Sequence, residues 1–344
     1  MRIFLSLFLI FGLVLLQVGC STQTVSSEIN DDVHNNEVIT VYLNDFDDII
    51  GPMFEEATGY KVKLVQGSGA EILSRIEAER GNPRWDVVWV DMISSVHGLG
   101  MNDMLYENYI PEHMATLKDS FQSLIPEQKW YYPTGAHASA VIVYNHHALT
   151  TEEAPTSWHD FSNPTLLNSI GVADPTIAAP AYAFVNSFFY QYGMTQGKTM
   201  MSNWLDNGLQ IYPKNPNVAM ALISGQIKVA ALQENNAYIL LNQQQPISIV
   251  WPEEGAPAAV RVAAISKKTS KLEAAQAFIN FLLDPATQQK IVENSDDAYH
   301  EPSALGVQIK ADRNSSAKLV FADTLWSYEH EAEIKQWFAD FSVR

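Results

Sequence analysis

Apolar runs separated by short polar breaks fill the chain from Val38 onward, and their spacing predicts strands and helices in alternation. A β-branched run at 38–43 predicts a buried strand, the alternating segment 60–65 predicts a second strand, and 86–90 predicts a third. The segment 68–71 (SGAE) is a capping box, which predicts the start of a helix between the second and third strands. Strands that alternate with short helices indicate parallel β-α-β units with right-handed crossovers. The chain is therefore predicted to have an α/β fold.

The same alternation continues through the second half of the chain. It predicts a buried strand at 140–145, a long helix that opens at 174–176 and ends at Gly193, and a strand at 228–232 followed by a polar loop at 233–238. A return strand is predicted at 258–265, and an amphipathic helix follows it at 272–283.

A chain of 344 residues exceeds the usual size of a single hydrophobic core, so two lobes are expected. We expect the chain to cross between the lobes twice, because the 272–283 helix must return to the first lobe. Lobe 1 is predicted to comprise 38–133 plus 258–300, and lobe 2 to comprise 134–257 plus 301–344. A cleft between two such lobes is a natural ligand site.

The first residues of the chain have the pattern of an export signal. Arg2 precedes an apolar run at 3–18, which is short for a membrane span and is followed by Gly19-Cys20-Ser21. The end of this run resembles a bacterial lipobox, although Gln17 stands where that pattern has an aliphatic residue; an ordinary secretory signal is the alternative. Residues 1–19 are thus predicted to be a lipoprotein signal peptide, Cys20 the lipidated residue, and the polar segment 20–37 a tether that holds the protein at the bacterial cell envelope.

Composition narrows the functional classes. A hydrophobic content of 47% with 17% charged residues excludes a disordered chain, and a net charge of -18 argues against a nucleic-acid partner. With one cysteine, no intramolecular disulfide can form. The sequence lacks a Gly-x-Ser-x-Gly elbow, a phosphate-binding Gly-Lys loop and a His-Glu-x-x-His helix. We therefore expect a binding protein and not an enzyme; a secreted hydrolase is the alternative class.

Candidate ligand contacts lie where predicted strands end, because ligands of open α/β sheets bind at the carboxyl ends of strands. From the first half these residues are Asn44, Asp45, Ser68, Gly69 and Asp91, and from the second half they are Thr134, Thr176, Ala179, Asn236 and Tyr238. Two simpler interpretations stay open: Ser68 could only cap its helix, and Asp91 could be only a turn residue.

Over nearly the whole mature chain, the order of segments resembles the substrate-binding proteins of bacterial ABC importers, within the cluster that includes ferric-iron binders. The likeness is carried by 54–62 (FEEATGYKV), 81–89 (GNPRWDVVW), 173–176 (ADPT) and 277–288 (AFINFLLDPATQ). The resemblance implies a two-lobed, hinge-linked periplasmic-binding fold of type II that traps its solute by domain closure. It also implies an ABC permease as membrane partner, a monomeric chain and no cofactor.

The resemblance also bears on the ligand. The ferric-binding members hold iron through a histidine, a carboxylate and a tyrosine pair, which fall here on Phe46, Asp91, Ala237 and Tyr238. Two of these four ligands are missing, so no metal site is predicted. Other members of the cluster take organic phosphorus compounds. We expect a small polar organic solute, similar to a phosphonate or a sugar phosphate; ferric iron or an iron chelate is the alternative.

Replacing the predicted lipidated cysteine tests the anchor. A Cys20→Ser protein cannot be acylated on a thiol, so it should appear in the soluble fraction when cells are fractionated and blotted. A Ser27→Ala protein, altered within the predicted tether, should stay in the membrane fraction. If Cys20→Ser protein remained in the membrane fraction with an uncleaved N-terminus, the lipoprotein assignment would be wrong.

Overall fold

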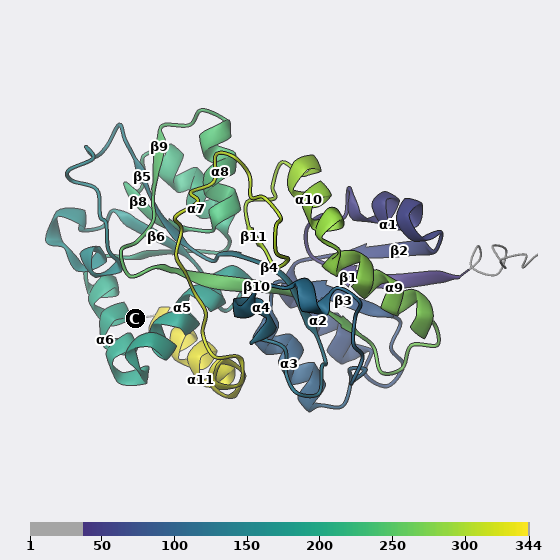
Figure 1. The fold of residues 1–344 in the computed structure, drawn as a ribbon. Helices are drawn as coiled ribbons and strands as arrows, with labels where there is room; N and C mark the ends of the chain where they lie inside the picture. The colour runs from purple at the N-terminus through teal and green to yellow at the C-terminus, as the bar shows by residue number, and fades with distance from the viewer. Residues whose placement is uncertain (1–36, 343–344) are drawn as a thin grey trace, which may run out of the picture. The chain divides into compact units, whose positions relative to one another are not determined.

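The computed structural model describes residues 37–342, and these residues form two β-sheets with helices packed on both (Figure 1). The predicted signal peptide and almost all of the predicted tether lie outside the described residues. Within residues 37–342, no helix has the length and apolar character needed to cross a bilayer. The predicted α/β class is confirmed.

The first sheet has seven strands in the order β11-β4-β10-β3-β1-β2, with β12 paired to one end of β10. β1 runs parallel to both β2 and β3, whereas β10 runs antiparallel to β3 and β4. The strand bounds are β1 Val38–Leu43, β2 Lys61–Gln66, β3 Val87–Val90, β4 Tyr132–Ala138, β10 Ala256–Ile265, β11 Glu301–Pro302 and β12 Leu319–Val320.

The second sheet has five strands in the order β7-β6-β8-β5-β9. β6 runs parallel to β7 and β8, and β5 runs antiparallel to β8 and β9. The bounds are β5 Val141–Asn145, β6 Ile170–Ala173, β7 Gln210–Tyr212, β8 Val229–Leu232 and β9 Ile247–Val250.

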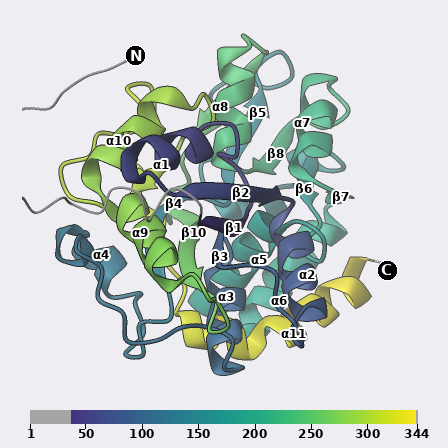
Figure 2. The same cartoon turned by 90° about the vertical axis from the view of Figure 1, so that its right-hand side faces the viewer.

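Helices cover both faces of each sheet. On the first sheet, α1, α9 and α10 lie on one side and α2 and α3 on the other (Figure 2). The helices are α1 Ile50–Thr58, α2 Gly69–Ala78, α3 Ile93–Met101, α4 Asp119–Gln122, α5 Ala179–Tyr192, α6 Met194–Asp206, α7 Asn215–Ile223, α8 Glu234–Asn242, α9 Leu272–Leu283, α10 Pro285–Asn294 and α11 Thr324–Ser342. Short 3-10 turns lie at Met114–Thr116, Trp158–Ser162 and Pro164–Leu166.

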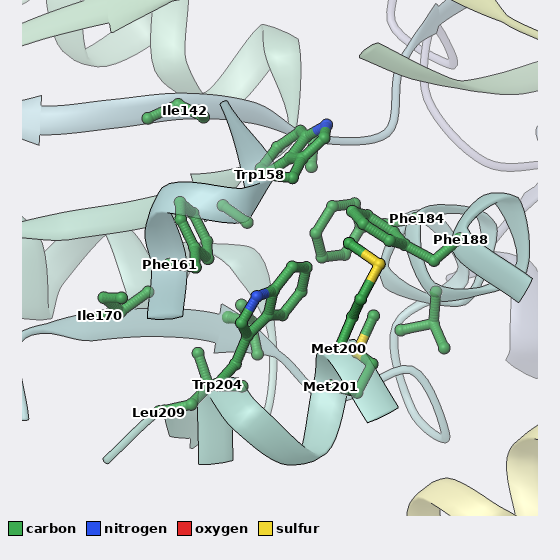
Figure 3. Packing of buried hydrophobic residues seen from close by; sticks show 14 of the residues in the cluster. Ile142, Trp158, Phe161, Ile170, Phe184, Phe188, Met200, Met201, Trp204 and Leu209 are labelled. Carbon is green, nitrogen blue, oxygen red and sulfur yellow. The ribbon is translucent and has the colours of Figure 1, made fainter. Parts of the chain in front are cut away.

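The core of the second sheet is rich in aromatic rings (Figure 3). Trp158 packs edge-on against Phe161 at 5.4 Å between ring centroids, and Trp204 contacts Phe161 at 5.2 Å and Phe188 at 5.0 Å. These rings come from a 3-10 turn and from α5 and α6, so they fix both helices to one face of the sheet. Large buried rings of this kind contribute much of the apolar area that stabilises a fold.

The chain passes from the first sheet to the second between β4 and β5, and it returns between β9 and β10. β4 begins two residues before the expected boundary at Thr134, and all of it belongs to the first sheet. The C-terminal α11 packs against both α3 and α5. The division of the chain into lobes at the residues named above stays a prediction.

Most predicted elements coincide with the observed ones, including the strand at 38–43 and the helix at 272–283, but two differ. The long helix begins at Ala179 and not at 174–176, because the Asp174 carboxylate accepts hydrogen bonds from the Thr176 backbone N–H at 2.8 Å and from its hydroxyl at 2.6 Å, which closes a turn. The expected loop at 233–238 is wrong: α8 begins there at Glu234.

A buried ion pair connects the start of α8 to the C-terminal part of the chain. Glu234 is fully buried, and its carboxylate lies 2.5 Å from Nε of Arg313 while also accepting the Ala138 backbone N–H at 2.8 Å. Burial raises the pKa of Glu234, and the charge and hydrogen bonds of Arg313 oppose that rise. The pair therefore fixes three segments that are far apart in the sequence.

Removing one member of this pair should be costly, because it leaves an uncompensated buried charge. We expect Arg313→Met to lower the free energy of unfolding by about 3 to 5 kcal/mol, measured by urea denaturation. The double variant Arg313→Met with Glu234→Gln should recover part of that loss. Arg75→Met, which breaks an ion pair whose arginine side chain is 50% exposed, should change the free energy of unfolding far less, because solvent screens exposed ion pairs. Equal losses for Arg313→Met and Arg75→Met would contradict this account.

Candidate functional site

A hollow of about 1030 Å³, open to solvent, lies where loops from both sheets meet. Every loop that lines it follows a strand: β1, β2 and β3 of the first sheet, and β6, β7 and β8 of the second. Its lining residues are Asn44, Asp45, Gln66, Gly67, Ser68, Gly69, Glu71, Asp91, Ile177, Ala178, Pro180, Lys214, Asn215, Pro216, Gln233, Asn235 and Asn236. The carboxyl ends of the strands of both sheets thus open onto one site, as open α/β sheets arrange their ligand sites.

The structure brings six of the ten predicted contact residues to this hollow. They are Asn44, Asp45, Ser68, Gly69, Asp91 and Asn236. That these six contact a ligand stays a prediction.

The other four residues lie elsewhere. Thr134 is buried behind the hollow and accepts a hydrogen bond from the Trp89 indole at 2.9 Å. Thr176 is exposed, and its hydroxyl is occupied by Asp174. Ala179 is the first residue of α5, and its side chain lies outside the described residues.

Tyr238 does not line the hollow, because α8 turns its side chain away. Its ring stacks on Tyr299 with 4.2 Å between centroids and 1° between planes, and its hydroxyl accepts the Asn314 backbone N–H at 3.0 Å. A loop at 233–238 could have presented both Asn236 and Tyr238 to one site. A helix separates them, because residues two apart point in different directions.

Four helices begin at the hollow: α2, α5, α7 and α8. The first N–H groups of a helix have no carbonyl partner within it, and its N-terminal end carries a partial positive charge. Within residues 37–342, the N-caps of α5, α7 and α8 make no side-chain capping hydrogen bond, whereas Ser68 and Glu71 form a complete capping box on α2. Three helix ends therefore offer positive potential to whatever occupies the hollow.

Asp91 is almost fully buried and is oriented by neighbours from several strands. Asn44 donates to Asp91 Oδ1 at 2.7 Å, and His137 Nε2 lies 3.8 Å from Asp91 Oδ2. Burial first, and then the charge of Arg261, lowers the pKa of His137 to about 3, so the imidazole is neutral. The side-chain amide of Gln233, 3.0 Å from the same ring nitrogen, can then donate to it and connect the two sheets.

Arg261, on β10, organises the loop that follows β1. Its guanidinium donates to the Asn44 carbonyl, to Asn44 Oδ1 at 2.9 Å and to the Asp45 carboxylate. It also lies over the rings of Phe46 at 5.2 Å and Trp89 at 5.3 Å, within the range of cation-π attraction. Arg261 is 6% exposed, so these contacts hold a buried charge in place.

The same loop has an unusual backbone. Asp45 and Phe46 both have positive φ values, 65° and 60°. For residues other than glycine this left-handed conformation is uncommon, and it persists where surrounding contacts enforce it. Arg261 contacts both residues: it donates to the Asp45 carboxylate and lies over the ring of Phe46.

Sequence reasoning missed Arg261 and His137. The available signal for Arg261 was a single charged residue inside the otherwise apolar run 256–265 (APAAVRVAAI). A buried arginine needs several acceptors, so its presence there indicates a polar partner nearby. His137 carries no such signal, because its partners come from distant strands.

The described part of the chain contains no group of three or more His, Cys, Asp or Glu side chains arranged to hold a metal ion. At the four positions compared with ferric ligands, Phe46 packs against Trp89 and Arg261, and Ala237 is fully buried in α8. Tyr238 is engaged as described above.

Residues 90–321 match a family model described as bacterial extracellular solute-binding protein, and the chain belongs to this family. A relative from Salmonella typhimurium, named as a putative 2-aminoethylphosphonate-binding periplasmic protein, is 26% identical over 75% of this chain and 77% of its own length. The major ferric iron-binding protein of Neisseria meningitidis serogroup B is 24% identical over 70% of this chain and 73% of its own.

Solved structures agree on the fold. The periplasmic binding protein AfuA from Actinobacillus pleuropneumoniae, with fructose-6-phosphate bound, superposes with a TM-score of 0.79 at 18% identity, over 89% of this chain and 98% of that one. Iron-bound HitA from Pseudomonas aeruginosa gives a TM-score of 0.76 at 19% identity, over 88% of this chain and 99% of that one. The expected two-lobed periplasmic-binding fold is confirmed.

Arg261→Lys tests the organising role of the arginine, because one ammonium group cannot reproduce the guanidinium contacts to Asn44 and Asp45. We expect the free energy of unfolding to fall by about 2 kcal/mol. Amide hydrogen exchange of Ile49 and Ile50, which donate to the Phe46 carbonyl at 3.2 and 3.0 Å, should accelerate. Arg80→Lys, at a half-exposed arginine paired with Glu77, is the matched control and should change neither quantity. Unchanged exchange at Ile49 and Ile50 would refute the role.

Proposed function

We propose that this member of the solute-binding family is the capture component of an ABC importer and that it binds a small organic solute through a phosphonate or phosphate group. The hollow lined by Asn44, Ser68, Lys214 and Asn236 is the binding site in this proposal. The two lobes close on the solute, and the loaded protein delivers it to a membrane permease.

The observation that carries the proposal is the convergence of four helix N-termini on one hollow, three of them without a side-chain cap. Free N–H groups and positive dipole ends favour a phosphoryl oxyanion. Lys214 is the one basic side chain among the described residues that line the hollow, and it adds a full positive charge at the start of α7.

The acidic residues of the hollow all have hydrogen-bonding partners. Asp45 is paired with Arg261, Asp91 accepts a hydrogen bond from Asn44, and Glu71 accepts from Ser68 in the capping box. Arg261 balances the charge of Asp45, whereas the neutral donors Asn44 and Ser68 orient Asp91 and Glu71 without removing their charge. The proposal therefore assigns the oxyanion to the helix ends beside Lys214.

The names of similar proteins are consistent with a phosphoryl ligand. The Salmonella typhimurium relative is named for 2-aminoethylphosphonate, and AfuA holds fructose-6-phosphate. Both compounds combine a phosphoryl group with a small organic body, which fits the expectation from the sequence.

Ferric iron or an iron chelate is the second candidate, favoured by the likeness to the Neisseria meningitidis protein and to iron-bound HitA. The chemistry of the described residues supports it less. Fe(III) prefers anionic oxygen donors, and Phe46 and Ala237 have no donor side chain.

A hydrolase is also poorly supported. Ser68 is the one hydroxyl side chain among the described residues lining the hollow, and it donates to Glu71 Oε2 at 2.8 Å within the capping box. A serine nucleophile needs a general base within reach, usually histidine.

For localisation, we propose that acylated Cys20 anchors the mature chain at the extracytoplasmic face of the bacterial envelope, with 20–37 as the tether. A monomer suffices, since both sides of the hollow come from one chain.

Calorimetric titration of the purified chain tests the ligand class. We expect methylphosphonate and inorganic phosphate to bind, and Lys214→Ala to weaken both by about tenfold, because a charge-assisted hydrogen bond is worth roughly 1.5 to 3 kcal/mol. Lys198→Ala, at a lysine of α6 paired with Glu333 and absent from the hollow, should leave binding unchanged.

Ferric citrate serves as the competing ligand in the same titrations. Binding of ferric citrate with a visible phenolate absorption band, together with no response to any phosphoryl compound, would replace the proposed function with the ferric one.

A further inference from the structure

A second cavity adjoins the hollow and shares Asp45 and Asn235 with it. It is narrow and lies between the loop after β1, the strand β4 and the helix α10. Much of its wall is apolar, formed by rings and aliphatic side chains. These are Phe46, Trp89, Leu282, Ile291 and Tyr299.

Most polar groups in this wall already have partners; an exception is His300, whose buried Nδ1 makes no hydrogen bond within residues 37–342. Thr134 accepts from the Trp89 indole at 2.9 Å, and Arg261 is engaged by Asn44 and Asp45. The Gln288 amide nitrogen donates to the Leu282 carbonyl at 3.0 Å and to Ser303 Oγ at 2.9 Å, while its oxygen accepts the Ala304 N–H at 2.9 Å. A ligand inside the cavity therefore meets apolar surface and few free hydrogen-bonding groups.

The entrance of this cavity is more polar than its interior, because it carries the carboxylates of Asp45 and Asp297. Arg261 and Asn44 both donate to Asp45 Oδ2, which leaves Oδ1 without a donor among residues 37–342. Asp297 adds a second carboxylate, and its pKa is raised by partial burial and then by the charge of Asp45. These two carboxylates can accept hydrogen bonds from an amino group or a hydroxyl of a ligand that passes this edge.

We propose that this cavity is the specificity compartment of the site: it receives the carbon body of the solute and selects a short, mainly hydrocarbon body whose donor groups stay at the carboxylates of the entrance. The proposal rests on the proposed function, which places the phosphoryl group in the neighbouring hollow. Sugar phosphates are rejected, because several hydroxyls entering the cavity would lose water without gaining partners.

A homologous series tests the compartment. Methyl-, ethyl- and propylphosphonate are titrated into the purified chain, with inorganic phosphate and fructose 6-phosphate in parallel. Affinity should rise roughly fourfold for each added methylene, the factor that corresponds to transfer of one CH₂ from water to an apolar site. Fructose 6-phosphate should bind at least about tenfold more weakly than propylphosphonate.

Variants of Phe46 test whether the rise in affinity with chain length arises in this cavity. Phe46→Ala removes part of the apolar wall and should flatten the series, so that methyl-, ethyl- and propylphosphonate bind with similar affinity. Phe46→Trp keeps an aromatic wall but leaves less free space in the cavity. Affinity should therefore stop rising at a shorter alkyl chain than in the wild-type protein. Ile177→Ala, at an exposed side chain that lines the hollow but not the cavity, should leave the slope of the series unchanged. Melting temperatures confirm that each variant is folded.

The outcomes separate the two proposals. If methylphosphonate and phosphate bind but the series is flat, or fructose 6-phosphate binds as tightly as propylphosphonate, the compartment is refuted and the proposed function stands. If no phosphoryl compound binds the wild-type chain, the proposed function fails and this inference fails with it.

Discussion

The contacts of one buried guanidinium determine the geometry of the candidate site. Arg261 bonds to Asn44 and Asp45 and lies over Phe46 and Trp89, so the loop after β1 is held in a conformation that its own residues disfavour. Asn44, fixed in this way, in turn orients Asp91 at the end of β3. The charge of Arg261, buried in β10, thus positions polar groups at the ends of β1 and β3. Several acceptors and two aromatic rings surround this charge and offset the free-energy cost of removing it from water.

The charge of the whole protein and the potential at the site have different origins. The chain carries a net charge of -18, which would repel an anion at long range. At contact distance, however, the uncapped ends of α5, α7 and α8 add positive potential of their own, because helix dipole effects act within about one turn and solvent screens distant surface charges. The net charge of the chain therefore does not by itself exclude an anionic ligand at these helix ends.

Structural features that depend on residues close together in the sequence could be predicted from the sequence. Strands such as 38–43, the capping box at Ser68 and the position of Asp91 after a strand follow from local patterns, and the carboxyl-end rule brings them together. The orientation of Tyr238 could not be predicted from polar composition, because a helix starting at Glu234 turns it toward Tyr299. The roles of Arg261 and His137 depend on partners far away in the sequence, so no local pattern contains them.

The position of Arg261 beside Phe46 also bears on whether the site suits a metal ion. Where the resemblance to ferric binders places a histidine, this chain has Phe46, whose ring lies 5.2 Å from the Arg261 guanidinium. A fixed positive charge beside that position repels Fe(III). The same charge does not oppose a neutral or anionic organic group. The aromatic ring at this position and the buried arginine beside it thus act in the same direction, against a bound cation.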